Sequence, residues 1–302
     1  MKAGIIVVSA RGRLQVVATP IGNLADLSPR ARAALASAVV IAAEDTRHTR
    51  VLLEAVGVST PLVSLHAHNE ATRVPELLAR LARGEDVALV SDAGTPLISD
   101  PGFELVRRAA EAGFAVQAVP GPSAITAALA VAGLPTQRFC FEGFLPARAA
   151  ERRRALAQLA HETRTRVFFE APHRIRATLA DLAAAFGPER PAAVARELTK
   201  MHESLYRGTL GELLRRAGED GNFARGELTV VVHGADAPAA SADEPALRRT
   251  LEILLAELPP SRAAAAAARL TGASRAAAYA LATRGGSAGE RRQAQPEDEE
   301  MP

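Results

Sequence analysis

Between residues 14 and 134, short apolar segments alternate with segments of helical pattern, and a polar segment follows each apolar one. The apolar segments are residues 14–18, 39–43, 62–65, 87–90 and 115–119. Continuous apolar strands that alternate with helices are typical of a parallel sheet covered on both faces. The repeat therefore predicts an α/β domain with a parallel sheet over residues 12–134.

The carboxyl ends of parallel strands meet at one edge of a sheet, and ligands bind at that edge. The polar segments that follow the five predicted strands are residues 19–23, 44–47, 66–70, 91–96 and 120–123. We expect these segments to lie side by side and to form a binding site. Gly94 and Gly121 would let the backbone approach a ligand closely.

A second α/β region with a mixed sheet is predicted over residues 135–235. Its strands are expected near residues 139–141, 166–169, 192–196, 204–206 and 228–233. The short segment 204–210 leaves little room for a crossover helix, which favours antiparallel pairing.

Helical patterns beyond a linker at residues 235–245 predict a small third domain over residues 246–284. Gly272 separates two of its short helices, an arrangement typical of a helix-turn-helix. A plain helical hairpin packed on the body is the alternative. The tail 285–302 is expected to be disordered.

The composition is that of a soluble globular chain, with 48% apolar and 23% charged residues among 302. The longest uncharged apolar run, residues 124–134, is too short to cross a bilayer. Cys140 is the only cysteine, which excludes an internal disulfide and a zinc or iron–sulfur framework. We therefore expect a cytoplasmic protein with no membrane contact and no metal.

Arginines are concentrated between residues 147 and 176, where eight of them stand against three glutamates. Such a positive surface fits a polyanion, although a solvated helix face would give the same charge run. Lysine is rare, and Lys200 is the only one apart from Lys2. Its compact, titratable amine is something that arginine cannot supply.

The chain lacks the glycine motifs of dinucleotide-binding and P-loop proteins, and it lacks the G-x-S-x-G elbow of hydrolases. A rim of backbone groups with a few carboxylates instead suits a ligand without phosphate. S-adenosylmethionine is one such ligand among several.

Five motifs carry a resemblance to a known family: residues 44–47, 91–102, 120–124, 168–174 and 196–200. Over residues 14–234 they resemble the tetrapyrrole methylase superfamily, in particular its branch that methylates small-subunit ribosomal RNA. Gly272, Ser274, Arg275 and Tyr279 are similar to the small helical domain that this branch often adds. The resemblance implies a two-domain tetrapyrrole-methylase-like α/β fold, with a parallel-sheet N-terminal domain, a mixed-sheet second domain and a small C-terminal helical domain.

The resemblance also implies a function. Members of this branch use S-adenosylmethionine to methylate the ribose 2′-oxygen of a decoding-centre cytidine in 16S rRNA of the small ribosomal subunit, usually as homodimers. A tetrapyrrole or protein methylase of the same superfamily is an alternative. So is a non-catalytic regulator that binds nucleic acid.

Site residues follow from the positions that match these motifs. Cofactor contacts are expected from Asp92, Ala93, Gly94, Thr95, Pro96, Ser123, Ala124, Ala195, Arg196, Leu198, Gly226 and Glu227. Substrate contacts are expected from Glu44, Asp45, Arg47, His68, Asn69, His173 and Arg174.

Lys200 is the first candidate to engage the ribose hydroxyl, because neighbouring cations and partial desolvation would lower its pKa. Glu170 and Glu197 are alternative proton acceptors. A purely structural Arg–Glu–Lys ion-pair network is the competing interpretation.

Overall fold

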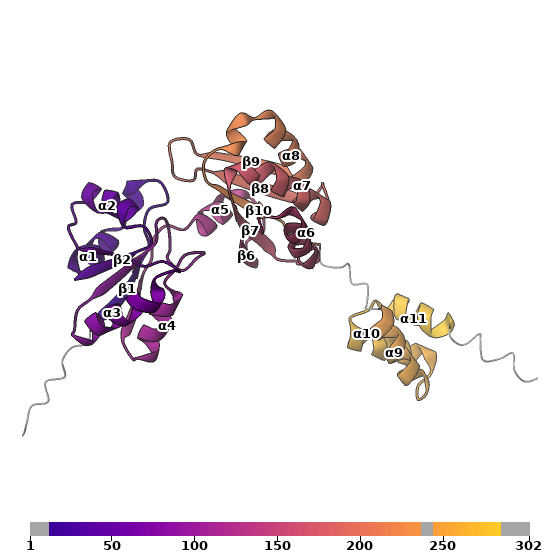
Figure 1. The fold of residues 1–302 in the computed structure, drawn as a ribbon. Coiled ribbons are helices and arrows are strands. Elements are labelled where there is room, and N and C mark those ends of the chain that lie inside the picture. The colour runs from indigo at the N-terminus through magenta and orange to yellow at the C-terminus, as the bar shows by residue number, and fades with distance from the viewer. Residues whose placement is uncertain (1–11, 237–243, 285–302) are drawn as a thin grey trace, which may run out of the picture. The chain divides into compact units, whose positions relative to one another are not determined.

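A computed structural model describes residues 12–236 and 244–284. The chain divides into two compact units, residues 1–235 and residues 236–302 (Figure 1). The first unit contains two five-stranded sheets. The predicted disordered tail, 285–302, lies outside the described residues. Across the described parts of the chain, no helix combines the length and the apolar character that a bilayer crossing requires.

The first sheet is entirely parallel, as the sequence predicts, and its strands lie in the order β3-β2-β4-β1-β5. The strands are β1 (Arg13–Val17), β2 (Val40–Ala43), β3 (Leu62–Ser64), β4 (Val87–Val90) and β5 (Ala115–Val119). Since all five run the same way, the polar loops that follow them lie at one edge of the sheet.

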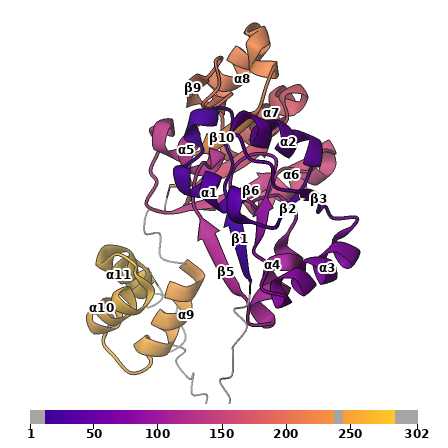
Figure 2. The same ribbon diagram turned by 90° about the vertical axis from the view of Figure 1, so that its left-hand side faces the viewer.

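Two pairs of helices cover this sheet: α1 (Pro29–Ser37) with α2 (Thr46–Ala55), and α3 (Glu70–Ala82) with α4 (Phe103–Glu111). Leu35 and Leu53 pack with Val17 on one face, and Leu77 packs with Leu14 on the other. Successive strand residues point to opposite faces, so the continuously apolar strands supply both layers. Figure 2 shows α3 and α4 together beside the sheet.

Helix α5 (Ala124–Ala132) covers the second sheet, although it follows the last strand of the first. Its residues Ile125, Ala128 and Leu129 pack against Ala193 and Val231 of that sheet. The chain thus passes from one sheet to the other before α5 rather than after it.

The second sheet is mixed, as predicted, in the order β6-β7-β10-β8-β9, with only β6 and β7 parallel. Its strands are β6 (Phe139–Phe144), β7 (Thr165–Glu170), β8 (Pro191–Arg196), β9 (Ser204–Thr209) and β10 (Leu228–Val232). Its other face packs on α6 (Ala149–Gln158), α7 (Ile175–Phe186) and α8 (Leu210–Glu219).

The second unit consists of α9 (Glu244–Leu255), α10 (Pro260–Thr271) and α11 (Arg275–Arg284). Leu247, Leu251 and several alanines form its own small core. Gly272 ends α10 in the left-handed conformation (φ 72°), which makes it the turn that the sequence predicts.

A buried ion pair joins α6 to α7. The Arg152 guanidinium lies 2.7 Å from the Asp181 carboxylate, and both side chains are less than a tenth exposed. Arg153 contacts the other oxygen of Asp181 at 2.8 Å, but its own side chain is 71% exposed. Two neighbouring arginines therefore bind one carboxylate from very different environments.

Replacing Asp181 with alanine should lower the free energy of unfolding by about 3–5 kcal/mol, because Arg152 is left buried and unpaired. Arg153→Ala is the matched control and should cost less than about 1 kcal/mol, because its charge remains in water. Urea denaturation of both variants measures the difference. Equal losses would contradict this account of the pair.

Candidate active site

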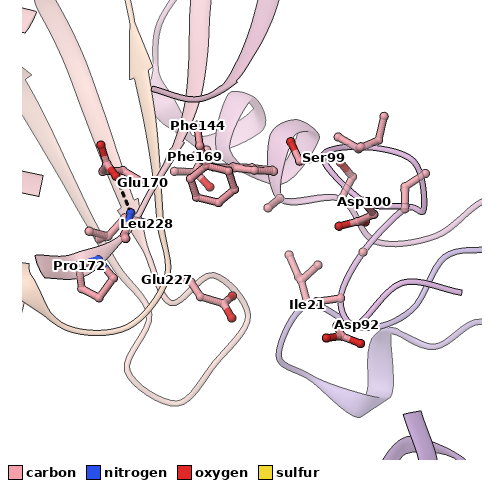
Figure 3. A pocket seen from close by; sticks show the side chains of 18 residues that line it. Ile21, Asp92, Ser99, Asp100, Phe144, Phe169, Glu170, Pro172, Glu227 and Leu228 are labelled. Carbon is pink, nitrogen blue, oxygen red and sulfur yellow. Dashed lines mark hydrogen bonds between the residues drawn. The ribbon is translucent and has the colours of Figure 1, made fainter. Parts of the chain in front are cut away.

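A pocket of about 430 Å³ lies where the loops of the first sheet meet the second sheet (Figure 3). The first sheet and the start of α5 contribute Ile21, Asp92, Ala93, Gly94, Thr95, Ile98, Ser99, Asp100, Ser123 and Ala124. The second sheet contributes Phe144, Phe169, Glu170, Ala171, Pro172, Glu227, Leu228 and Thr229.

The loop after β4 is irregular and strained. Leu97 (φ 75°) and Ser99 (φ 69°) occupy the left-handed region, as do Gly94 and Gly102. Side-chain-bearing residues in that region cost about 1–3 kcal/mol each and occur mostly at functional sites. The strain turns Ile98, Ser99 and Asp100 to the pocket.

Neighbouring loops hold this strained segment in place. The Thr19 and Gly94 backbones exchange two hydrogen bonds, of 2.9 and 3.1 Å. The Thr95 hydroxyl donates to the Pro122 carbonyl at 3.1 Å, and Glu70 accepts from the Gly102 N–H at 2.8 Å. The loops after three strands therefore fix one another.

The charge of the pocket is negative. Four of its lining residues are acidic, and among the described residues that line it none is lysine or arginine. Burial raises the pKa of Asp100 to about 6; a hydrogen bond with Ser91 opposes this increase, and the negative charge of Asp92 adds a smaller one. Burial and the acidic neighbours Asp100, Asp92 and Asp45 also raise the pKa of Glu44.

Phe144 and Phe169 form an aromatic wall, with ring centroids 5.6 Å apart. A β-bulge in β6 between Phe141 and Gly143 shifts the register just before Phe144. Sequence analysis missed this wall. The only signal was Gly143 inside a strand pattern, which is typical of a bulge.

Seven of the expected cofactor residues line the pocket: Asp92, Ala93, Gly94, Thr95, Ser123, Ala124 and Glu227. The structure does not bring the other five to the pocket wall. Pro96 is buried, and Ala195 and Leu198 pack beneath α5. The Arg196 guanidinium donates to the Arg225 and His202 carbonyls, at 2.8 Å each.

Gly226, the last of these five residues, does not line the pocket but lies in a backbone turn beside it. It is left-handed (φ 73°), and a Cβ there would collide with the Glu197 side chain. It therefore permits the turn that presents Glu227.

The expected lowered pKa of Lys200 is wrong. Burial alone would lower it, but hydrogen bonding to Glu197 and the charge of Glu227 outweigh burial and raise the pKa of Lys200. Its ammonium lies 2.9 Å from Glu197 and 3.2 Å from Glu227. A charged lysine cannot accept a proton, so the geometry fits the ion-pair interpretation.

Glu170 and Glu197, the two alternative proton acceptors, already have hydrogen-bond and ion-pair partners. Glu170 is fully buried, accepts from the Thr178 hydroxyl and pairs with Arg174 at 3.1 Å. Glu197 accepts from Lys200 and from the Glu227 N–H. Neither carboxylate is placed to take a proton from an incoming hydroxyl.

The expected substrate residues divide into capping and exposed groups. Asp45 caps α2, while Asn69 accepts from the His66 N–H and donates to Ser64. Arg174 donates to the Leu145 carbonyl. The remaining members of the set do not line the pocket either: Arg47, His68 and His173 are exposed, and Glu44 is half-buried.

Two family models match successive parts of the chain. The family model described as Tetrapyrrole (Corrin/Porphyrin) Methylases matches residues 13–214. A model described as RsmI C-terminal HTH domain matches residues 241–284, which favours the helix-turn-helix over a plain hairpin.

Relatives match along most of the chain. Ribosomal RNA small subunit methyltransferase I of Xylella fastidiosa (strain Temecula1) is 56% identical over 272 residues, covering 90% of this chain and 99% of that protein. The protein of the same name from Pseudomonas aeruginosa is 53% identical, covering 86% and 93%.

Solved structures share the fold of about three quarters of the chain. Cobalt precorrin-4 methyltransferase, CbiF, has a TM-score of 0.57 at 18% identity, covering 76% of this chain and 98% of its own. Uroporphyrin-III-C-methyltransferase from Thermus thermophilus has a TM-score of 0.54 at 25% identity, covering 74% and 94%. The chain therefore belongs to the family of Tetrapyrrole (Corrin/Porphyrin) Methylases.

Proposed function

We propose that this chain uses S-adenosylmethionine to methylate the ribose 2′-oxygen of a decoding-centre cytidine in 16S rRNA. The observation that carries the proposal is the acidic, partly apolar pocket at the strand ends, in a chain 56% identical to a protein named for small-subunit rRNA methylation. When bound, S-adenosylmethionine supplies a methyl group activated by a positively charged sulfur.

The residues of the pocket fit such a cofactor. A cationic ligand is favoured by Asp92 and Asp100, and the described lining contains no lysine or arginine to oppose it. The other two carboxylates, Glu170 and Glu227, are already paired with Arg174 and Lys200. Phe144 and Phe169 offer a face on which an adenine ring can stack. Gly94 allows close backbone approach, since a Cβ there would lie 3.3 Å from Ile21.

The chain must also engage the hydroxyl proton of the acceptor. Among the acidic residues of the pocket, Asp92 and Glu227 keep side chains that are 36% and 73% exposed, whereas Glu170 is enclosed. Of these two, Asp92 is better placed to take that proton than Lys200, Glu170 or Glu197, because no lysine or arginine pairs with it among the described residues. Glu227 is less suited, since it is paired with Lys200 at 3.2 Å. A positioned proton acceptor contributes about 10²–10⁴-fold to such a reaction.

The proposed partner is 16S rRNA in the small ribosomal subunit, which implies a cytoplasmic location. Arg148, Arg153, Arg154 and Arg176 of the arginine-rich stretch are exposed and could meet phosphates. Arg148 and Arg153 would do so while also paired with Glu151 and Asp181. Arg152 and Arg166 are buried in structural contacts instead. Homodimer formation remains a prediction that a solution mass measurement would check.

The function is tested with purified protein, labelled S-adenosylmethionine and three acceptors: small subunits, free 16S rRNA and a porphyrinogen. We expect methyl transfer to ribosomal RNA, located at a cytidine ribose by alkaline-resistance mapping. Transfer to the porphyrinogen alone would replace the proposal with a tetrapyrrole methylase. Cofactor binding without transfer to any acceptor would favour a regulator.

Phe144→Ala should weaken S-adenosylmethionine binding about tenfold, because one base–aromatic contact is worth about 1–3 kcal/mol. Phe144 is 55% exposed, so its removal should leave folding intact. Phe139→Ala, at the other end of the same strand and 42% exposed, is the matched control and should bind normally. Titration calorimetry measures both affinities. An unchanged affinity in Phe144→Ala would show that the adenine ring does not stack on this wall.

Cofactor affinity should rise with pH around pH 6. The pKa of Asp100 is raised to about 6, so the carboxyl is neutral below that pH and negative above it. A cationic ligand prefers the negative form, and affinity should therefore fall between pH 7 and pH 5. Asp100→Asn should bind more weakly at pH 7 and show a flatter profile. An unaltered pH profile in this variant would show that Asp100 does not face the cofactor.

A further inference from the structure

The last two helices of the helical unit lie in a basic segment without acidic residues. Residues 258–284 contain four arginines and no aspartate or glutamate, whereas α9 contains two glutamates. Arg262, Arg269 and Arg275 are exposed, and none of them pairs with a carboxylate in the part of the chain that the structure describes. A surface with unpaired positive charge fits a polyanion.

Two of these arginines occupy positions that a helix disfavours. Arg262 lies in the first turn of α10 and Arg275 in the first turn of α11, and neither turn contains an acidic residue. The first turn of a helix carries partial positive charge, so a cation placed there weakens the helix. Helix stability therefore does not account for these two arginines, whereas contact with a negatively charged partner does.

One aromatic side chain lies on the surface of this unit. Tyr279 is the only aromatic residue of α9, α10 and α11, and it is 50% exposed. Arg275 lies four residues before it, so the two side chains are neighbours on one side of α11. Ala278, by contrast, packs into the core of the unit. An exposed aromatic ring and an unpaired cation therefore lie together on the outer surface of α11.

The rest of this surface is poor in hydrogen-bonding groups. Ala276, Ala277 and Ala280 are exposed. The Thr283 hydroxyl already donates to the Tyr279 carbonyl at 3.0 Å. A helix that reads base pairs in a duplex uses side chains such as arginine, asparagine or glutamine, and between its two terminal arginines α11 has none. A tyrosine ring instead suits an unpaired base, because every base has a face that can stack.

We propose that the helical unit binds an unpaired segment of ribosomal RNA, with one base stacked on Tyr279 and a phosphate beside Arg275. Unpaired bases in RNA loops are commonly recognised by stacking on aromatic side chains. Such a contact holds RNA without selecting a sequence, so the target nucleotide must be selected elsewhere in the chain. This inference rests on the proposed function and assigns part of its RNA contact to α11.

Tyrosine fluorescence tests the stacking in the full chain. The chain has two tyrosines and no tryptophan, so Tyr206→Phe leaves Tyr279 as the only tyrosine. The phenylalanine keeps a ring against Phe223, on which Tyr206 packs. We expect a single-stranded segment of 16S rRNA to quench the emission of Tyr279, after correction for absorbance by the RNA. A duplex of the same sequence should quench it much less.

Substitutions separate stacking from charge, with affinity for the labelled single strand measured by fluorescence anisotropy at several salt concentrations. Tyr279→Ala should weaken binding about tenfold, because it removes one base–aromatic contact. Tyr279→Phe keeps the ring and should bind normally. Arg275→Gln should reduce the slope of log affinity against log salt by about 0.7, the share of one phosphate contact with a single strand.

Ile253→Ala is the matched control, because Ile253 is a 72% exposed apolar residue of the same unit, on α9. It should bind RNA as the unmodified protein does. All these variants should keep their affinity for S-adenosylmethionine, since the cofactor pocket lies in the first unit.

Contrary outcomes are distinct for the two proposals. Unweakened binding by Tyr279→Ala, or bound RNA without quenching, would overturn the stacking contact. So would equal weakening by Ile253→Ala or by Tyr279→Phe, or tighter binding of the duplex than of the single strand. Failure of the unmodified protein to methylate ribosomal RNA, with RNA binding that still depends on Tyr279, would defeat the proposed function alone.

Discussion

The paired hydrogen bonds between Thr19 and Gly94 are the interaction on which the active site depends. They join the loops after β1 and β4, two neighbouring central strands of the first sheet. With this anchor the following loop can hold Leu97 and Ser99 in left-handed conformations. The energy stored in that backbone is offset by the core beneath it, and it fixes the side chains that line the pocket.

The negative charge of the pocket follows from the side chains that line it. Arg153 and Arg154 lie on helix α6, outside the pocket lining, and Arg152 is paired with Asp181, whereas four carboxylates line the pocket. Asp92 and Asp100 raise the negative potential in a partly apolar cavity, where charge is weakly screened. The same pocket would reject phosphates, which agrees with the absence of phosphate-binding glycine motifs from the sequence.

Strand and helix positions could be predicted because the apolar periods of the first unit are regular, and the sheet edge that holds Asp92 to Thr95 followed from them. Ile98 and Asp100 were missed because Asp100-Pro101 resembles a helix start, whereas α4 begins at Phe103. The position of Phe144 depends on a β-bulge in β6, which the alternation of apolar residues does not show. The direction of the pKa shift of Lys200 was predicted wrongly because the sequence does not show that its ammonium bonds to Glu197, three residues earlier, or that Glu227, 27 residues away, joins them in the fold.

The passage into α5 sets how the two walls of the cofactor pocket can move. Residues 120–123 join the sheets and read Pro-Gly-Pro-Ser, so two of the four have a fixed φ. Gly121 is packed so closely that a Cβ would lie 3.1 Å from Ala18. A joint this stiff makes a poor hinge, and the pocket should keep its width through each round of catalysis. Exchange of spent cofactor then depends on side chains at its mouth, such as the half-exposed ring of Phe144.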